Sequence, residues 1–474
     1  MGSMSAHYLV FFGVHAMVAI MAATHALLNK RDPRSAWGWI AACWLFPYAG
    51  AALYYLFGMN RVERLAQRLR GPRRPAPIPG GDINPPATRQ SDATGVRELV
   101  RLGEALTGWP LVRGNRIEPL FNGEQAYPAM LEAIRGARRS ICLSTYIYFH
   151  DIVGEQFAAA LSEARQRNVD VRVLLDGMAD VFYRPRGSAL LESRGLRPAL
   201  FLPLRWWPPL FHINLRNHRK LLLVDEEVAF TGGMNIAAHH LLNLPQRHHV
   251  EDLHFRIRGP LTRQMADAYA ADWRFVTEEN TAASQTPPPA AGDAIARVIT
   301  SGPSEGRDIL MLILIGALAS AHHRAWIMTP YLVPSPALVS ALQAAALRGV
   351  DVSIILPQRS DHPWIDWATR NLLAPLLQHQ VRIYYRPAPF AHTKLFLVDD
   401  DYVQFGSANI DTRSLRLNFE LVVEAFDPRL VEKLTRHFEE VRNRSEAVTL
   451  REIEARSLPV RLRDAISWLF SPYF

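Results

Sequence analysis

One pattern of residues occurs twice in this chain, and it limits the folds that the chain can adopt. Each copy has His-x-Lys, four residues, Asp, six residues and then Gly-[Gly/Ser]-x-Asn. Identical spacing in two places indicates an internal duplication, with half of one site in each copy. The members are His218, Lys220, Asp225 and Gly232-Gly233-Met234-Asn235 in the first copy, and His392, Lys394, Asp399 and Gly406-Ser407-Ala408-Asn409 in the second.

The segments before each copy repeat as well. A buried strand, a helix and a second buried strand with the core Val-Asp-Val are expected in both places. They cover residues 140–148, 154–167 and 169–175, and then residues 325–332, 336–348 and 350–356. Strands that alternate with helices predict an α/β fold, with mostly parallel sheets flanked by helices. We therefore expect two tandem halves related by pseudo-twofold symmetry.

Two apolar runs precede the duplicated region. Residues 8–28 form an uncharged run of membrane-spanning length, and residues 36–58 form a second run that Pro47 interrupts. Together they predict a transmembrane helical hairpin whose second arm is kinked or re-entrant. A signal peptide and a buried core hairpin are the alternatives.

The positive charge of the chain is concentrated beside these runs. Between Lys30 and Arg74 there are nine basic and two acidic residues, so this stretch carries +7 of the chain's formal +8. The remainder is close to neutral, which argues against a nucleic-acid enzyme. Arginines after the second run favour a cytoplasmic location for the bulk of the protein, although the basic loop at residues 30–34 opposes it.

These observations divide the chain into five parts. The predicted boundaries are 1–60 for the hairpin, 61–96 for a basic, Pro-rich linker, 97–280 for the first half, 281–292 for an Ala- and Pro-rich linker, and 293–474 for the second half.

The pattern itself suits phosphate chemistry. In an extended segment, residues two apart share a face, so each histidine points the same way as its lysine. Lys220 and Lys394 would supply positive charge for phosphate oxygens, and the amides of Asn235 and Asn409 could donate further hydrogen bonds. Two such half-sites place a histidine on each side of one phosphorus. That arrangement predicts in-line displacement through a phosphohistidine, with one histidine as nucleophile and the other as acid and base.

Carboxylates complete the predicted site. An acidic partner should fix the tautomer of each imidazole. We expect Glu420 to serve His392 and Asp252 to serve His218. The motif aspartates Asp225 and Asp399 are counted with the catalytic set, although their expected contribution is hydrogen bonding that holds the local fold. No cluster has metal-ligand spacing, so neither a metal nor another cofactor is expected.

The duplicated pattern is that of the phospholipase D superfamily, and the resemblance covers residues 97–474. Within it, several segments resemble bacterial cardiolipin synthases. They are Asn217-His218-Arg219-Lys220, Gly232-Gly233-Met234-Asn235 and Gly406-Ser407-Ala408-Asn409-Ile410-Asp411 with Arg413 and Ser414, together with Arg34-Ser35-Ala36-Trp37, Pro47, Gly50, Tyr54 and Gly58 near the start and Leu469-Phe470-Ser471-Pro472 at the end.

The resemblance implies a reaction between two lipids. A phosphatidyl group passes from one phosphatidylglycerol to an enzyme histidine, glycerol leaves, and a second phosphatidylglycerol takes the group to give cardiolipin. By similarity, His218 is the nucleophile and His392 the acid and base, although the near symmetry of the halves does not fix this assignment. The resemblance implies anionic phospholipids as partners and no nucleic acid. It also implies a multi-pass anchor in the bacterial inner membrane. Whether the protein forms a homo-oligomer stays open.

Several rival functions stay open at this stage. They are a hydrolytic phospholipase D, a phosphatidylserine synthase-like transferase, the use of phosphatidylethanolamine as second substrate, and an inactive scaffold that binds anionic lipid. A nuclease shares the motifs but not the anchor. Two segments could also contact lipid: the loop at residues 204–211, which contains two tryptophans, and the stretch at residues 462–474. Packing within the protein is the alternative for each of them.

Overall fold

The structure is a computed structural model that describes residues 2–30, 33–58, 93–203, 215–281, 286–302 and 308–471. The chain divides into two compact units, Met1–Leu69 and Arg70–Phe474, which we call the N-terminal unit and the larger unit. Most of the predicted linker at 61–96 and all of the tryptophan loop at 204–211 lie outside the described residues. The domain boundaries drawn from the sequence stay predictions.

The N-terminal unit confirms the first apolar run as one continuous helix, α1 (Gly2–Asn29). Its segment His7–Asn29 is the one helix in the described ranges that is long and apolar enough to cross a membrane. The second run is divided into α2 (Pro33–Leu45), α3 (Ala49–Leu53) and a π-helical turn, η1 (Tyr54–Gly58). The break at Pro47 is the one that proline predicts. A second crossing of the membrane stays a prediction.

Two of the three histidines of α1, His15 and His25, have polar partners in the segments that follow. Nδ1 of His25 lies 2.8 Å from the hydroxyl of Tyr54. Nε2 of His15 lies 3.4 Å from the carbonyl oxygen of Trp44. Polar groups in an apolar helix are tolerated where a neighbouring helix offers a hydrogen bond. These contacts therefore explain why an otherwise apolar run contains two imidazoles.

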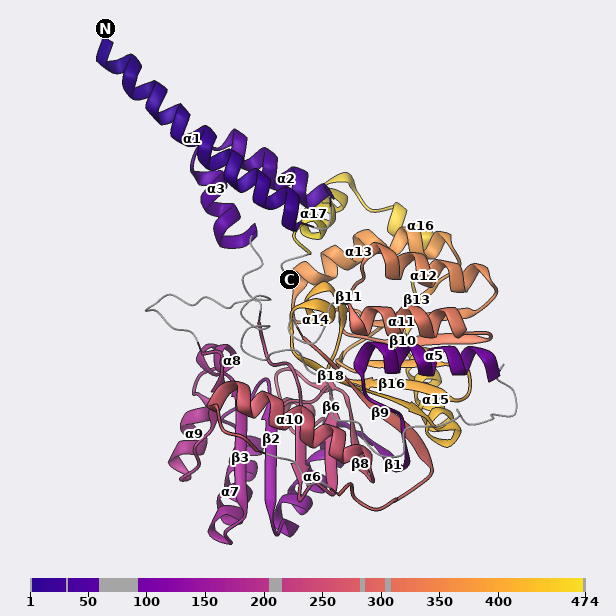
Figure 1. The fold of residues 1–474 in the computed structure, drawn as a ribbon. Coiled ribbons are helices and arrows are strands. Elements are labelled where there is room, and N and C mark those ends of the chain that lie inside the picture. The colour runs from indigo at the N-terminus through magenta and orange to yellow at the C-terminus, as the bar shows by residue number, and fades with distance from the viewer. Residues whose placement is uncertain are drawn as a thin grey trace. The chain divides into compact units, whose positions relative to one another are not determined.

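The larger unit is built on one continuous sheet of fifteen strands (Figure 1). Their order is β19-β13-β12-β10-β15-β16-β18-β9-β1-β8-β6-β5-β2-β3-β4. Apart from the edge strand β19, the two sides of this order mirror each other about the β9–β1 pair. The strands are β1 (Val112–Phe121), β2 (Ser140–Thr145), β3 (Asp170–Asp176), β4 (Ala199–Phe201), β5 (Leu221–Val224), β6 (Val228–Gly232), β8 (Leu253–Arg258), β9 (Ala294–Ser301), β10 (Arg324–Met328), β12 (Asp351–Pro357), β13 (Arg382–Arg386), β15 (Leu395–Val398), β16 (Tyr402–Gly406), β18 (Glu420–Phe426) and β19 (Glu446–Ala447).

The sheet is mixed. The trios β2-β3-β4 and β10-β12-β13 run parallel, as their buried apolar runs predict. The strands that follow each His-x-Lys segment form antiparallel hairpins, β5-β6 and β15-β16. The α/β class and the duplication are thus confirmed, while the hairpins make the sheet less parallel than predicted.

Helices cover both faces of this sheet. In the first half, α6 (Asn122–Gly136) packs against α7 (Ile152–Gln166), and both α6 and α10 (Leu261–Thr277) contact β1, β5 and β8. Each half has its own hydrophobic core, with Phe157 and Leu191 in one and Ile299 and Leu342 in the other. The remaining helices are α5 (Ala93–Thr107), α8 (Gly177–Phe182), α9 (Gly187–Ser193), η2 (Ala238–His240), α11 (Ile309–Ser320), α12 (Pro336–Leu347), α13 (Pro363–Gln378), α14 (Thr412–Arg416), α15 (Pro428–Asn443), α16 (Leu450–Glu454) and α17 (Leu458–Leu469).

Short parallel bridges join the two halves away from the main sheet. Asn217 pairs with Phe419, and β14 (Phe390–Ala391) pairs with β7 (Val250–Glu251). A third short pair, β11 (Leu332–Val333) with β17 (Ile410–Asp411), lies within the second half. The first two bridges connect each histidine segment to the opposite half, and they determine the geometry of the site.

Candidate active site

Both His-x-Lys segments lie at the carboxyl ends of parallel strands. Because β5 runs antiparallel to β2, with Leu221 opposite Ser144, the segment before β5 lies beyond the end of β2. There the ring of His218 is 5.1 Å from that of Tyr146. The second segment has the same relation to β10, where Leu395 faces Met328. Ligands of open α/β sheets commonly bind at these strand ends.

Each histidine pairs with a carboxylate from the opposite half. Nδ1 of His218 lies 3.1 Å from Oε2 of Glu420, and Nδ1 of His392 lies 2.8 Å from Oδ2 of Asp252. The pairing predicted from the sequence, which kept each carboxylate with the histidine of its own half, is therefore wrong.

The reason for this exchange lies in the backbone. The amide of His218 donates to the carbonyl of Phe419, the residue before Glu420, at 2.9 Å. The amide of His392 donates to the carbonyl of Glu251, the residue before Asp252, at 2.8 Å. Each bridge thus sets one imidazole beside the carboxylate of the other half.

The two carboxylates have different surroundings. Glu420 is fully buried and also accepts from Oγ of Ser407 at 2.5 Å and from Nδ2 of Asn418 at 3.3 Å. The residue that matches Ser407 in the first copy is Gly233. A Cβ atom at Gly233 would lie 2.4 Å from Oδ2 of Asp252, so a side chain cannot be added there without a shift. Asp252 accepts instead from the backbone amide of Leu253 at 2.8 Å.

These surroundings shift the pKa values of Glu420 and Asp252 in opposite directions. Burial raises the pKa of Glu420, but the nearby His218, Lys220 and Ser407 outweigh it, and the pKa ends below its usual value. Burial raises the pKa of Asp252 to about 6, although Lys394 opposes the shift. One pair of the site therefore has a firmly ionised acid, and the other has an acid that titrates near neutral pH.

The two lysines are buried beside their histidines. Nζ of Lys220 donates to the carbonyl of His218 at 2.7 Å, and Nζ of Lys394 donates to that of His392 at 2.6 Å. Nζ of Lys394 also lies 2.9 Å from both ring nitrogens of His392. Burial lowers the pKa of Lys220 to about 7 and that of Lys394 to about 8. A bound anion would favour the charged form of both.

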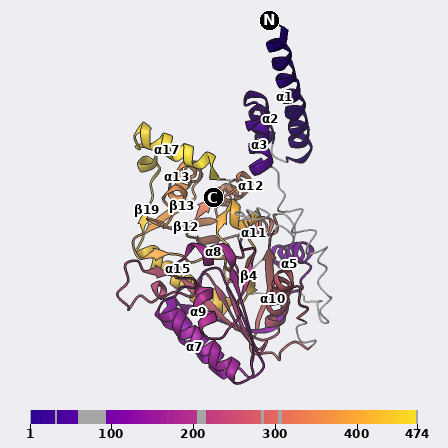
Figure 2. The same ribbon diagram turned by 90° about the vertical axis from the view of Figure 1, so that its left-hand side faces the viewer.

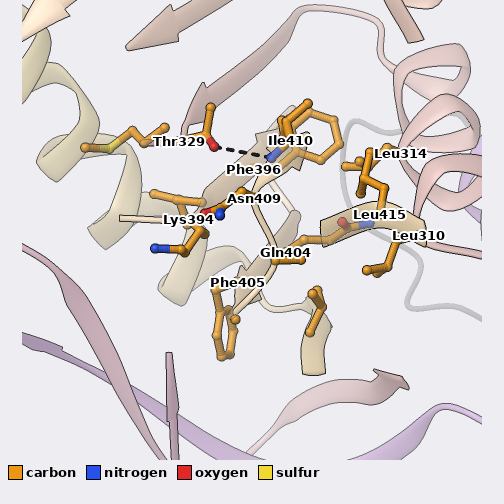
Figure 3. Close-up of a pocket in the computed structure, with 15 residues that line it drawn as sticks. Leu310, Leu314, Thr329, Lys394, Phe396, Gln404, Phe405, Asn409, Ile410 and Leu415 are labelled. Carbon is orange, nitrogen blue, oxygen red and sulfur yellow. Dashed lines mark hydrogen bonds between the residues drawn. The ribbon is translucent and has the colours of Figure 1, made fainter. Parts of the chain in front are cut away.

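The two motif asparagines, Asn235 and Asn409, are buried. Oδ1 of Asn235 accepts from the amide of Ile147 at 3.3 Å. Asn409 and Lys394 line a cavity of about 40 Å³ whose other walls are mostly apolar, as Figure 3 shows. Oδ1 of Asn409 has no hydrogen-bond partner among the described atoms. The phosphate-binding roles of these residues stay predictions.

Comparison with known families agrees with this geometry. A family model described as "Cardiolipin synthase, PLD-like domain" matches residues 130–273 and 314–442, more than half of the chain. The chain belongs to this cardiolipin synthase family. A second model, described as the N-terminal segment of phospholipase D-nucleases, matches residues 17–58.

Individual relatives cover nearly the whole chain. Cardiolipin synthase A of Pseudomonas aeruginosa PAO1 is 31% identical over 427 residues, which is 88% of this chain and 86% of the relative. Cardiolipin synthase A of Pseudomonas putida KT2440 is 29% identical over 488 residues and covers 99% of both chains. Among solved structures, a phosphatidylserine synthase from Haemophilus influenzae superposes with a TM-score of 0.64 at 14% identity, over 79% of this chain and all of that one. This likeness concerns the fold alone.

The cardiolipin synthase motif also contains two aspartates that the structure places outside the site. Asp225 accepts from the backbone amides of residues 138–140, at 2.7 to 2.9 Å. Asp399 accepts from those of residues 322–324, at 2.8 to 3.0 Å. Each lies at the far end of a four-residue strand from its lysine, which is about 13 Å along the strand. The prediction that counted Asp225 and Asp399 with the catalytic residues is corrected. Both aspartates hold turns at the end of the sheet opposite the site.

Two other residues of this cardiolipin synthase site were missed from the sequence. Arg219 is buried, binds both oxygens of Asp272 at 2.8 and 2.9 Å, and donates through Nε to the carbonyl of Glu420 at 3.0 Å. No sequence pattern marks this contact, because the partners are 53 and 201 positions away. Ser407 could have been noticed, since it replaces a glycine of the other copy.

Proposed function

We propose that this chain is a cardiolipin synthase that moves a phosphatidyl group from one phosphatidylglycerol to a hydroxyl of a second. The products are cardiolipin and glycerol. The observation that carries the proposal is the pair of imidazole–carboxylate contacts, His218 with Glu420 and His392 with Asp252, made between the halves. Membership of the cardiolipin synthase family supports the choice of substrate and the association with a membrane.

In the first step, His218 attacks the phosphorus. Its Nδ1–H donates to Glu420, which leaves the Nε2 lone pair free as the nucleophile. Burial lowers the pKa of His218 and keeps the ring neutral, although Glu420 opposes this shift. A P–N bond forms while the P–O bond to glycerol breaks. Burial and the neighbouring Lys394 lower the pKa of His392 well below its usual value, and the anionic phosphate between the histidines opposes this shift, so that His392 can give the leaving oxygen its proton. The lysines stabilise the charge on the phosphate oxygens.

In the second step, the direction of proton transfer reverses. A hydroxyl of the second phosphatidylglycerol gives its proton to His392 and attacks the phosphorus as the P–N bond breaks. His218 returns to its starting form, and His392 again carries the proton that it lost. Glu420 remains ionised throughout and balances the positive charge on the phosphorylated His218 ring.

The location of the enzyme forms part of the proposal. We expect an anchor of more than one pass in the bacterial inner membrane, with the larger unit on the cytoplasmic side. Arginines that follow the second apolar run support this orientation. Anionic phospholipids other than phosphatidylglycerol could bind as well, and phosphatidylethanolamine is an alternative acceptor.

Product analysis tests the proposal. Purified protein would be mixed with phosphatidylglycerol in detergent micelles without added metal, and the lipids followed by mass spectrometry. Cardiolipin and glycerol should form, and His218→Ala and His392→Ala should abolish both. The exposed His248→Ala is the matched control and should leave turnover unchanged. Phosphatidic acid alone would assign the chain to the hydrolases, and no turnover would favour a lipid-binding scaffold.

A trapping experiment tests the nucleophile. His392→Ala lacks the proton donor but keeps His218, so a slow first step should leave a phosphatidyl group on the protein. We expect an acid-labile adduct on His218 by peptide mass spectrometry after a rapid quench at high pH. The reciprocal variant His218→Ala should give no adduct, and an adduct on His392 in that variant would reverse the assignment.

A further inference from the structure

The last helix of the chain, α17, has its polar side buried and its apolar side exposed. Asp464 is completely buried and Ser467 is 93% buried. In contrast, five large apolar side chains on this segment are each 53 to 67% exposed. They are Leu458, Leu462, Ile466, Leu469 and Phe470. This is the reverse of the pattern expected for a surface helix of a soluble domain.

Polar contacts are what attach α17 to its neighbours. Asp464 accepts from Arg456, just before α17, at 2.5 Å, and its carboxylate lies 3.7 Å from Nε of Arg370 on α13. The hydroxyl of Ser467 donates to the carbonyl of Trp364, in the first turn of α13, at 2.7 Å. Figure 2 shows α17 lying along α13. Buried polar groups therefore contribute to the docking of the helix, while the side chains of its apolar row stay more than half exposed.

The apolar row is a single face with charged edges. At 100° per residue, the five side chains fall within a sector of about 120°, with Arg461 and Arg463 just outside its two edges. Asp464 and Ser467 project from the opposite side of the helix. Arg461 is exposed, and Trp468 is partly exposed next to it. An apolar face bordered by arginine and tryptophan is typical of helices that lie in a membrane interface.

We propose that the apolar face of α17 lies in the interfacial layer of an anionic phospholipid bilayer. The same chain contains α1, whose length and composition suit a membrane span, so a lipid surface is available to it. The exposed Arg461 complements anionic headgroups. The inference goes beyond the proposed reaction, because it does not depend on which lipid reacts.

The position of α13 links this face to the site. α13 begins two residues after Asp361, which accepts a hydrogen bond from Tyr331, between β10 and β11. The charge of Asp361 also acts on His392 and Lys394. A lipid layer on α17 would therefore lie beside the start of α13, next to the segment that contains Asp361.

A depth measurement tests the contact. The full chain would carry Cys43→Ala and Cys142→Ala, and a single cysteine at Ile466→Cys would be labelled with an environment-sensitive fluorophore. After reconstitution in phosphatidylglycerol-containing vesicles, the label should be blue-shifted and strongly quenched by lipids with a nitroxide on the acyl chain. The exposed Glu432→Cys on α15 is the control and should be neither shifted nor quenched.

Two results would overturn the inference. Equal behaviour at the two positions would mean that the face of α17 lies in water. A blue shift without nitroxide quenching would mean that protein covers it, either another part of this chain or a second copy.

A kinetic measurement separates this inference from the proposed reaction. The double variant Leu462→Ser/Ile466→Ser should raise the apparent KM for vesicle phosphatidylglycerol several-fold in a surface-dilution assay. Its turnover of a short-chain phosphatidylglycerol dispersed as monomers should match that of the unmodified protein. An equal loss on both substrates would contradict a role at the lipid surface. If no variant and no control makes cardiolipin, the proposed function fails while the depth measurement still decides the contact.

Discussion

The hydroxyl of Ser407 lies 2.5 Å from the Glu420 oxygen that faces His218. The other half of the site lacks this contact, because Gly233 occupies the matching position beside Asp252. The two imidazole–carboxylate pairs are therefore alike in connectivity but different in acid strength. This difference supports the assignment of His218 as the nucleophile, since a phosphorylated imidazole is a cation and benefits from an acid that stays ionised.

Ser407→Ala should slow the reaction and shift its pH profile. Loss of a hydrogen bond to a charged group costs about 1.5–3 kcal/mol, so we expect kcat to fall about tenfold or more. The pKa of Glu420 should rise, and the acidic limb of the profile should move to higher pH. Ser162→Ala, which removes a hydroxyl bonded to the carbonyl of Arg194, is the control. An unchanged profile would rule out this role for Ser407.

Asp252→Asn should separate stability from activity. Burial raises the pKa of Asp252 in the folded protein to about 6, above the usual value of 3.8 for an aspartate. The folded protein therefore pays for ionising this acid, so stability falls as pH rises from about 4 to about 6 and stays lower above it. The penalty is on the order of 3 kcal/mol. Relative to the unmodified protein, the variant should therefore gain more stability at pH 8 than at pH 5. It should lose activity, because His392 loses its orienting acid. Chemical denaturation at both pH values checks this, and a loss of stability at both would contradict it.

Asp399 should matter for stability and little for chemistry. Asp399→Ala removes three backbone hydrogen bonds to a carboxylate, and we expect a loss of about 3–5 kcal/mol in the free energy of unfolding. Asp399→Asn should cost less, because asparagine tolerates the positive φ of 49° at this position and keeps one acceptor. Turnover per folded molecule should remain near normal in both. A large fall in kcat without a loss of stability would restore Asp399 to the catalytic set.

Anion binding to the free enzyme should weaken as the pH rises. Burial lowers the pKa of Lys220 to about 7 and that of Lys394 to about 8, so both lose their charge in this range. We expect the affinity for inorganic phosphate, measured by calorimetry, to fall up to about tenfold per pH unit between pH 7 and 8, where one lysine titrates, and up to about a hundredfold per unit above 8, where both must regain a proton. Lys394→Gln should weaken binding and flatten this dependence. The exposed Lys433→Gln should change neither.

The sequence predicted the parts of the fold that local patterns encode. The repeated Val-Asp-Val strands and the break at Pro47 follow from period and proline chemistry, whereas the antiparallel hairpins after His218 and His392 were not predicted. The partners of the histidines did not follow, because Glu420 and Asp252 are 202 and 140 positions away from the imidazoles that they contact.

Spacing within a motif was also an uncertain guide to proximity in space. Asp225 is five positions from Lys220, yet the extended strand between them places the two residues at opposite ends of that strand. The burial of the polar side of α17 depended on Arg456 and Trp364, which no helical periodicity reveals. Tertiary contacts of this kind determine the site and are not encoded in any single segment.

Each histidine of the site is paired with a carboxylate of the other half, and this arrangement has an evolutionary consequence. A protein made of two identical copies of one half would have to carry the same acid and the same neighbouring residue on both sides of its site. Every mutation would then alter nucleophile and proton donor together. After fusion into one chain, Gly233 could remain beside Asp252 while Ser407 accompanied Glu420, so the two histidines were free to specialise without an exchange of partners.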